Sequence, residues 1–126
     1  MNKLTLSILI LIFSTLQSSA QQNNKREIWL FTPDADNASF ITQKSALTDA
    51  AGLNERDLIV HEVVGVKANQ TKFKKYKAAA KTFTFILIGK DGGEKLRSNQ
   101  PISKEKLYRT VDDMPMRKSE MKRQKP

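Results

Sequence analysis

The sequence predicts a three-layer α/β sandwich with the order strand, helix, strand, helix, strand, strand, helix. Two short runs of β-branched, aromatic and aliphatic residues, 27–32 and 58–64, have the composition of strands. A third run, 83–88, is almost continuously apolar and leads into a glycine-rich turn. Apolar residues between and after these runs recur at helical spacing.

Residues 1–20 have the features of a secretory signal peptide. Lys3 supplies the positive charge, residues 4–16 the apolar segment, and Ser18 and Ala20 the small side chains before the cleavage site. The apolar segment is shorter than the roughly 20 residues of a transmembrane helix, although a retained anchor is the alternative. We expect an exported protein, periplasmic or secreted, with no transmembrane anchor after cleavage.

The composition limits both stability and chemistry. The 126 residues include 22 Lys and Arg against 13 Asp and Glu, a net charge of +9 that falls to +8 when Lys3 is removed, and no cysteine. Disulfides are therefore impossible, and the positive charge favours anionic partners. We expect a flexible leader at 21–26, one domain at 27–116 and a frayed basic tail at 117–126.

The first half of the domain should contain two strands and one helix. After the strand at 27–32, Asp36 or Asn37 is expected to cap a helix that runs to about residue 51, where Gly52 would end it. The second strand is expected at 58–64.

The second half should contain a helix at 69–80, with Phe73 and Tyr76 on its buried face. The strand at 83–88 is expected at the centre of the sheet, and right-handed crossovers predict that the first three strands are parallel. The turn at 91–93 should fold the fourth strand back as an antiparallel edge.

The last helix is expected to begin at Ser103, whose hydroxyl can cap it, with Ile102 and Leu107 as a hydrophobic staple. Pro115 should end this helix or open a short new turn.

Several phrases resemble one family. They are TFILIGKDGGEKLR at 84–97, PIS at 101–103 and DMPMRKSEM at 113–121, together with WLFTPDAD and RDLIVHEVVG in the first two strands. The chain resembles the domain of unknown function 4174 family over nearly its whole mature length. The resemblance implies a small exported domain with a thioredoxin-like or peroxiredoxin-like fold, related to domains in sushi-repeat and extracellular-matrix proteins.

The family brings no catalytic residues and no cofactor with it. In thioredoxins the redox cysteines follow the first strand, where this chain has Pro33, Asp34, Ala35, Asp36 and Asn37. A cis-proline precedes the third strand in thioredoxins, but this chain has no proline at Thr82 or Phe83. Thiol oxidoreductase and peroxidase activities are excluded by the lack of cysteine.

Asp34, Asp36 and His61 are the candidate pocket residues. The two aspartates follow a strand at the position where open α/β sheets bind ligands, but turn formation and helix capping also explain them. The single histidine lies on a strand and is interpreted as structural, paired with Asp57 or Glu62. We assign no metal site, although three methionines near Pro115, at 114, 116 and 121, could in principle bind copper(I).

The basic residues are the strongest positive signal. The anion-binding candidates are Lys72, Lys74, Lys75, Lys77, Lys81, Arg117 and Lys118. A lysine-rich solvated face is the alternative interpretation. Nucleic acid is disfavoured as a partner because Phe73 and Tyr76 belong to the buried side and because export removes the usual targets.

Two hypotheses follow. The first is a non-enzymatic exported domain that binds a protein or an anionic polymer or surface. The second is an enzyme that uses Asp34, Asp36 or His61 in place of thiols, which requires these side chains to share one pocket.

Overall fold

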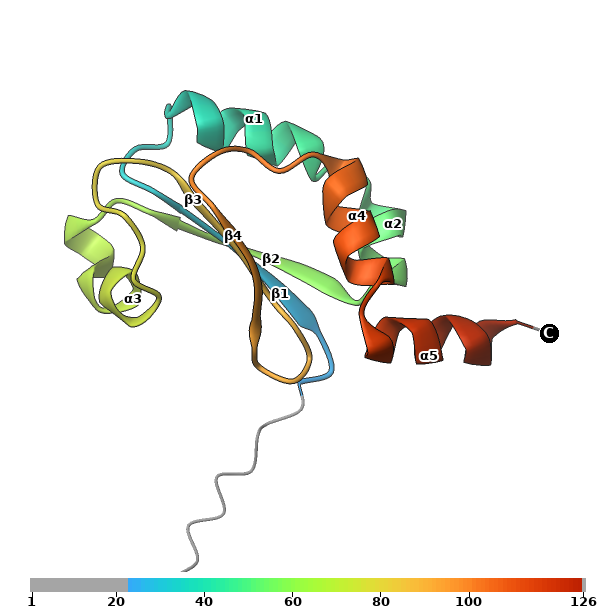
Figure 1. The fold of residues 1–126 in the computed structure, drawn as a ribbon. Coiled ribbons are helices and arrows are strands. Elements are labelled where there is room, and N and C mark those ends of the chain that lie inside the picture. The colour runs from blue at the N-terminus through green and yellow to red at the C-terminus, as the bar shows by residue number, and fades with distance from the viewer. Residues whose placement is uncertain (1–22, 126) are drawn as a thin grey trace, which may run out of the picture.

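The computed structural model describes residues 23–125 and has a four-stranded sheet with helices on both faces (Figure 1). The predicted signal peptide lies outside the described residues. No helix within 23–125 is long and apolar enough to cross a membrane. The elements are β1 (Arg26–Thr32), α1 (Ala38–Ala46), α2 (Ala50–Glu55), β2 (Leu58–Val64), the 3₁₀ turn η1 (Lys67–Asn69), α3 (Gln70–Lys75), β3 (Thr84–Ile88), β4 (Glu94–Ser98), α4 (Lys104–Asp112) and α5 (Pro115–Gln124).

The strands are arranged in the order β2-β1-β3-β4. β1 and β2 are parallel, with Trp29 opposite His61, whereas β3 is antiparallel to β1, with Trp29 opposite Ile86. β4 is the antiparallel edge strand, as predicted. The α/β class and the central place of β3 are confirmed, but the prediction that the first three strands are parallel is wrong.

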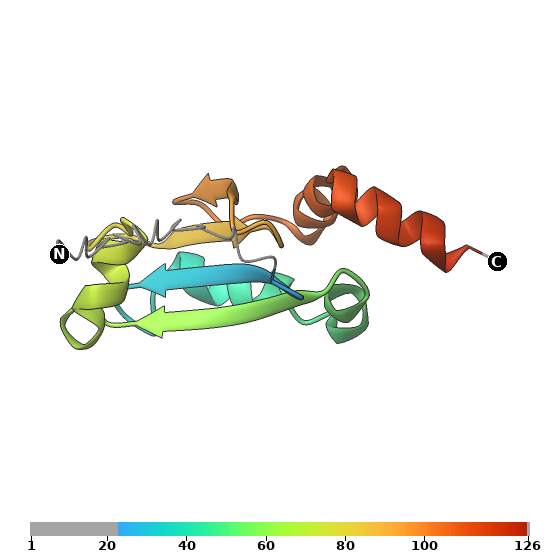
Figure 2. The same cartoon turned by 90° about the horizontal axis from the view of Figure 1, so that it is seen from below.

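The shortness and position of α3 are consistent with the direction of β3. A parallel crossover must return along the full length of a strand, about 23 Å for seven residues, but the six residues of α3 span only about 9 Å. Figure 2 shows α3 at the end of the sheet where β1 and β2 finish. The chain therefore enters β3 from that same end and runs back.

The larger core lies between the sheet and the helices α1, α2 and α4. Alternate residues of β1 and β3 point to this face, so Ile28, Leu30, Phe85 and Leu87 are fully buried there. The helices and loops contribute Phe40, Leu53, Ile102, Leu107 and Val111 to the same cluster.

The opposite face carries a smaller core that α3 covers at one end only. Phe31, Val63 and Ile86 of the sheet pack there against Phe73 of α3. The remainder of this face is more open, and Ile59 at its edge is 43% exposed. The two faces are therefore covered unequally (Figure 1).

The predicted helix from Asn37 to about residue 51 is two helices. Asn37 caps α1, accepting from the Phe40 amide at 3.1 Å, so this part of the prediction is confirmed. Asp49 caps a second helix, α2, by accepting from the amide of Gly52 at 3.2 Å. Gly52 therefore lies inside α2, and the prediction that it ends a helix is wrong.

α3 ends five residues before the predicted boundary at residue 80. Lys77 adopts a left-handed conformation with φ 52°. The amides of Lys77 and Ala78 donate to the carbonyls of Lys74 and Phe73 at 3.2 and 2.9 Å. These bonds form a Schellman motif, which stops the helix. Lysine occupies the position that glycine usually takes, so the boundary has no sequence signature.

The C-terminal part is more ordered than predicted. The Ser103 hydroxyl caps α4 as expected, and the staple residues Ile102 and Leu107 are buried. Pro115 is the first residue of a further helix, α5, which is a favourable place for proline because its missing amide has no helical partner there. The tail that was expected to be frayed forms most of α5, so that expectation is wrong.

Replacement of Gly52 by alanine should destabilise the protein, although alanine is normally the better helix former by about 1 kcal/mol. An added Cβ would lie 2.5 Å from the Tyr108 hydroxyl and would also clash with the Asp49 carboxylate. We expect G52A to lower the unfolding free energy by about 1–3 kcal/mol in urea denaturation.

The exposed Asn54 of the same helix provides the control. N54A should change the unfolding free energy by less than about 0.5 kcal/mol. A stabilised G52A variant would contradict the placement of Gly52 against Tyr108.

Candidate functional site

The turn after β1 presents its two aspartates to solvent. The side chains of Asp34 and Asp36 are exposed, and the turn is held by backbone contacts. The Thr32 hydroxyl donates to the Asp34 carbonyl at 2.8 Å, and the Asn37 amide donates to the same carbonyl at 3.3 Å. Within residues 23–125 there is no group of three or more His, Asp or Glu side chains that could hold a metal ion.

His61 lies in the middle of β2 and is not directed at this turn. Its ring stacks on Trp29 with a centroid distance of 4.2 Å, and its Nε2 lies 3.7 Å from Glu27 Oε1. Glu27 also accepts from the Trp29 indole at 3.0 Å. The expected partner Glu62 is a neighbour on the same strand and therefore points to the opposite face. The structure does not bring His61, Asp34 and Asp36 together.

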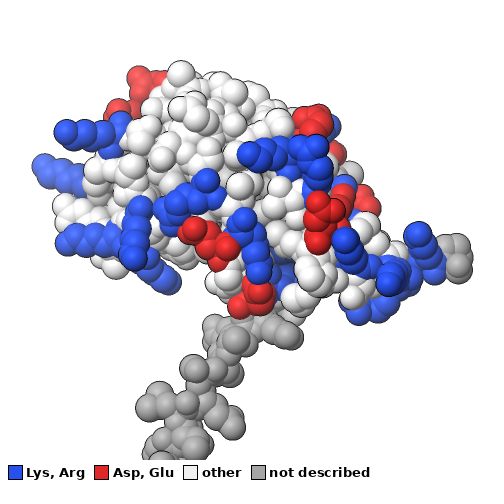
Figure 3. All heavy atoms as spheres, in the orientation of Figure 1, with Lys and Arg blue, Asp and Glu red and all other residues white. Residues whose placement is uncertain are grey.

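The lysines around α3 form a basic surface at one end of the sheet. Five lysine side chains there are exposed, and none of them forms a salt bridge to any residue within 23–125. They are Lys72, Lys74, Lys75, Lys77 and Lys81. The first three lie on α3, and the other two follow the C-terminal end of this helix. In Figure 3 basic side chains project from the side of the molecule where Figure 1 has α3. We call these five residues the α3 lysine cluster.

A shallow groove of about 510 Å³ lies within the α3 lysine cluster. Val66, Phe73, Ala78 and Ala80 provide apolar surface, while Lys74 and Lys77 add charge. The left-handed Lys77 turns the chain out of α3, so that residues after the helix return alongside it. The groove therefore combines positive charge with apolar surface.

The two basic candidates in the tail differ from each other. Lys118 is exposed, but Arg117 is only 1% exposed, contrary to its assignment to a solvent-facing tail. The Arg117 guanidinium donates to Asp112 at 3.2 Å and to the carbonyl and carboxylate of Glu55, each at 3.2 Å. Its charge is thus directed inward, toward acidic partners.

A second buried arginine, Arg26 at the start of β1, connects the sheet to α5. It is 1% exposed, and its two terminal nitrogens donate to the two carboxylate oxygens of Glu120, both at 3.2 Å. Lys90 also donates to Glu120, at 2.7 Å, and to Asp57, at 2.8 Å. Arg56 forms two bonds to Asp112, at 3.1 and 3.0 Å.

We call these side chains the α5 ion network; its members are Arg26, Glu55, Arg56, Asp57, Lys90, Asp112, Arg117 and Glu120. It contains four cations and four carboxylates.

Three carboxylates of the network, Asp57, Asp112 and Glu120, have lowered pKa values, which favours their charged form. Burial alone would raise the pKa of Asp112, but hydrogen bonds from Arg56 and Arg117 outweigh it and lower the pKa below 3.8. Burial would also raise the pKa of Glu120, but the hydrogen bonds from Lys90 and Arg26 outweigh it and lower this pKa from 4.5. The bond from Lys90 lowers the pKa of Asp57, with burial opposing it.

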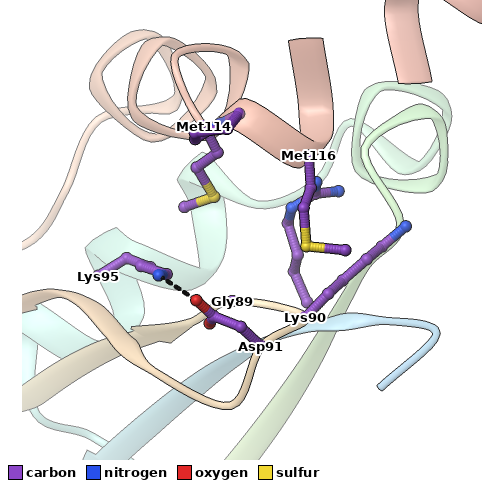
Figure 4. Close-up of a pocket in the computed structure, with 8 residues that line it drawn as sticks. Gly89, Lys90, Asp91, Lys95, Met114 and Met116 are labelled. Atoms are coloured by element: carbon purple, nitrogen blue, oxygen red, sulfur yellow. Dashed lines mark hydrogen bonds and ion pairs between the residues drawn. The ribbon is translucent and has the colours of Figure 1, made fainter. Parts of the chain in front are cut away.

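A pocket of about 220 Å³ lies beside this network, between the β3–β4 turn and the junction of α4 and α5 (Figure 4). Lys90, Asp91 and Lys95 line it from the hairpin, and Met114 and Met116 extend toward them from the helix junction. Gly89, Pro115 and Arg26 complete the lining. The GKDGG and DMPMR phrases of the sequence thus form its opposing walls.

The family follows from a comparison with known families. The family described as "Domain of unknown function (DUF4174)" matches residues 17–120. The chain belongs to this family. The match to the DUF4174 domain includes both walls of the pocket and extends to Glu120, so it covers both partners of the Arg26–Glu120 pair. No curated protein matches the chain.

Sequence reasoning missed Arg26, Arg56, Asp112 and Glu120. Each lies at the end of a strand or helix or on a polar helix, and most have charged neighbours in the sequence, which is typical of a solvent-exposed segment. Their partners lie up to 94 residues apart in the sequence, so no local spacing could have revealed the network.

Replacing Glu120 should destabilise the protein because its loss leaves buried Arg26 without its carboxylate partner and Lys90 with Asp57 alone. We expect E120Q to lower the unfolding free energy by about 2–4 kcal/mol, measured by urea denaturation. The control E105Q makes the same change at an exposed position on α4 and should have an effect below about 0.5 kcal/mol. Equal effects of the two variants would contradict a structural role for Glu120.

The same carboxylates predict acid sensitivity. Their folded pKa values lie below the unfolded ones, so their contribution to stability is complete above about pH 5 and is lost as the pH falls through the folded values, below about pH 4. The unfolding free energy should therefore be nearly constant from pH 5 to 8 and decrease below pH 4. In E120Q the decrease should be shallower, and an unchanged slope would argue against Glu120 as a titrating contributor.

Proposed function

We propose that the protein is an exported, non-redox domain with a thioredoxin-like fold that binds an anionic polymer through the α3 lysine cluster. The strand and helix order, the antiparallel edge hairpin and the helices on both faces support the fold. The signal-like N-terminal segment supports export, to a periplasm or out of the cell. The family resemblance supports a relation to domains in sushi-repeat and extracellular-matrix proteins.

The state of the lysines carries the functional proposal. Four basic residues form salt bridges with carboxylates of the same molecule: Arg26, Arg56, Lys90 and Arg117. In contrast, the five lysines of the α3 cluster have exposed side chains and no carboxylate partner within residues 23–125. An uncompensated group of like charges attracts polyanions and releases their counterions on binding.

The apolar surface of the groove adds contact area beside the charges. Phe73 and Ala78 line the groove together with Lys74 and Lys77, so a bound polyanion can contact both kinds of surface. The alternative, a non-thiol enzyme, has no comparable support because Asp34, Asp36 and His61 do not share a pocket.

The experiment is a titration of the protein with a fluorescently labelled sulfated polysaccharide such as heparin, followed by anisotropy at several salt concentrations. Affinity should fall at least tenfold between 50 and 200 mM salt, because several ion contacts form together. K74E/K77E should lower the affinity at least tenfold further at low salt.

The matched control is K104E/K106E, which reverses two exposed lysines on α4 and changes the net charge equally. It should weaken binding no more than about threefold, as expected of a long-range charge effect. Weak binding even at low salt, or equal losses in the two double variants, would overturn the proposal.

A further inference from the structure

We propose that the pocket between the β3–β4 turn and the α4–α5 junction binds a small organic anion: a carboxylate with a short apolar chain. This site lies at the opposite end of the sheet from the α3 lysine cluster (Figure 1) and is independent of it. One wall of the pocket can contact the apolar chain of such a ligand, and the other can bind its carboxylate.

One wall is apolar. Met114 and Met116 extend into the space from the helix junction (Figure 4), and Pro115, between them in the sequence, also lines the pocket. Thioether side chains are flexible and polarisable, so they adapt to short apolar chains of different shape. The volume of about 220 Å³ limits the ligand to a small molecule.

The other wall supplies positive charge and hydrogen-bond donors. Three cations, Arg26, Lys90 and Lys95, line the pocket beside one carboxylate, Asp91. Arg26 and Lys90 are already paired with Glu120, so Lys95 is the cation that a ligand can engage. The Asp91 oxygens are both engaged, one by the Gly93 amide at 2.9 Å and the other by Lys95 at 2.7 Å. A ligand therefore meets few free acceptors here.

Several donors of the cations remain unused within residues 23–125. An ammonium group has three N–H donors. Lys95 uses one of them, on Asp91, and Lys90 uses two, on Asp57 and Glu120. The Arg26 Nε has no hydrogen-bond partner within the described residues, but the atom is inaccessible to solvent, so the donors open to a ligand are those of the partly exposed Lys95.

Lys95 thus offers two unused N–H donors at the pocket wall, from which a carboxylate ligand can accept. The arrangement is better matched to an oxyanion than to packing alone.

The backbone of the turn keeps Lys95 in this place. A Cβ on Gly89 would lie 2.6 Å from the Lys95 Cε and 3.0 Å from an Asp91 oxygen. The absence of a side chain at Gly89 lets the Asp91–Lys95 pair lie against the turn, at the pocket wall. Lys95 is 33% exposed, so its ammonium group can exchange between Asp91 and a ligand without unfolding the hairpin.

The test uses protein labelled with ¹³C at the methionine methyl groups, titrated with hexanoate and followed by two-dimensional NMR. The Met114 and Met116 signals should shift and saturate. Met121 lies outside the pocket, among Lys118, Lys122 and Lys125, and serves as an internal control for non-specific association. Hexanol, which lacks the charge, and acetate, which lacks the chain, should each bind at least about tenfold more weakly than hexanoate.

K95Q should weaken hexanoate binding about tenfold, whereas K104Q on α4 should leave it within twofold. The proposal is overturned if hexanoate leaves the Met114 and Met116 signals unmoved, if hexanol shifts them at the same concentrations, or if Met121 responds in parallel. These comparisons use the unaltered protein, so they decide the question even if K95Q fails to fold.

Discussion

The C-terminal third of the molecule depends on two arginines that are almost completely buried. Arg26 and Arg117 are each 1% exposed, and removing a guanidinium group from water is costly unless carboxylates compensate for it. Glu120 and Asp112 provide this compensation from α5 and α4. Because Arg26 begins β1, its bond to Glu120 ties the last helix to the centre of the sheet. The pocket beside α5 exists only while this helix is docked.

The α5 ion network also separates two kinds of basic residue that net charge cannot distinguish. At the end of the sheet near α5, cations are paired and serve the fold or line the pocket. At the opposite end, the α3 lysine cluster faces solvent and forms no salt bridge to any of the described residues. The net charge of +9 therefore adds together basic residues that are paired with carboxylates and basic residues that are not. We infer that a polymeric anion and a small anion would be recognised at different ends of the same sheet.

The first three strands were predictable because each is a short apolar run, and the predicted range of β2 matches the structure residue for residue. The polar β4 was predictable only from the glycine-rich turn before it. The caps at Asn37 and Ser103 were equally readable from their side-chain chemistry. The ends of α2 and α3 could not be predicted in this way. Asp57 and Lys77 adopt the left-handed conformation there, and glycine is the residue that usually signals it in a sequence. The direction of β3 and the docking of α5 depend on tertiary contacts, which no local pattern encodes. The pocket could not be predicted either, because tertiary contacts bring together its two walls, which lie about 20 residues apart in the chain.

The docking of α5 by the buried arginines can be tested most directly by native-state amide hydrogen exchange of its residues, with α4 as the internal reference. Amides in the interior of α5 should be protected at pH 7 to a degree comparable with those of α4, and E120Q should reduce protection in α5 more than in α4. Exchange of the α5 amides at the rate of an unstructured chain would contradict the account, because the helix would then be a free tail and the pocket would lack one wall.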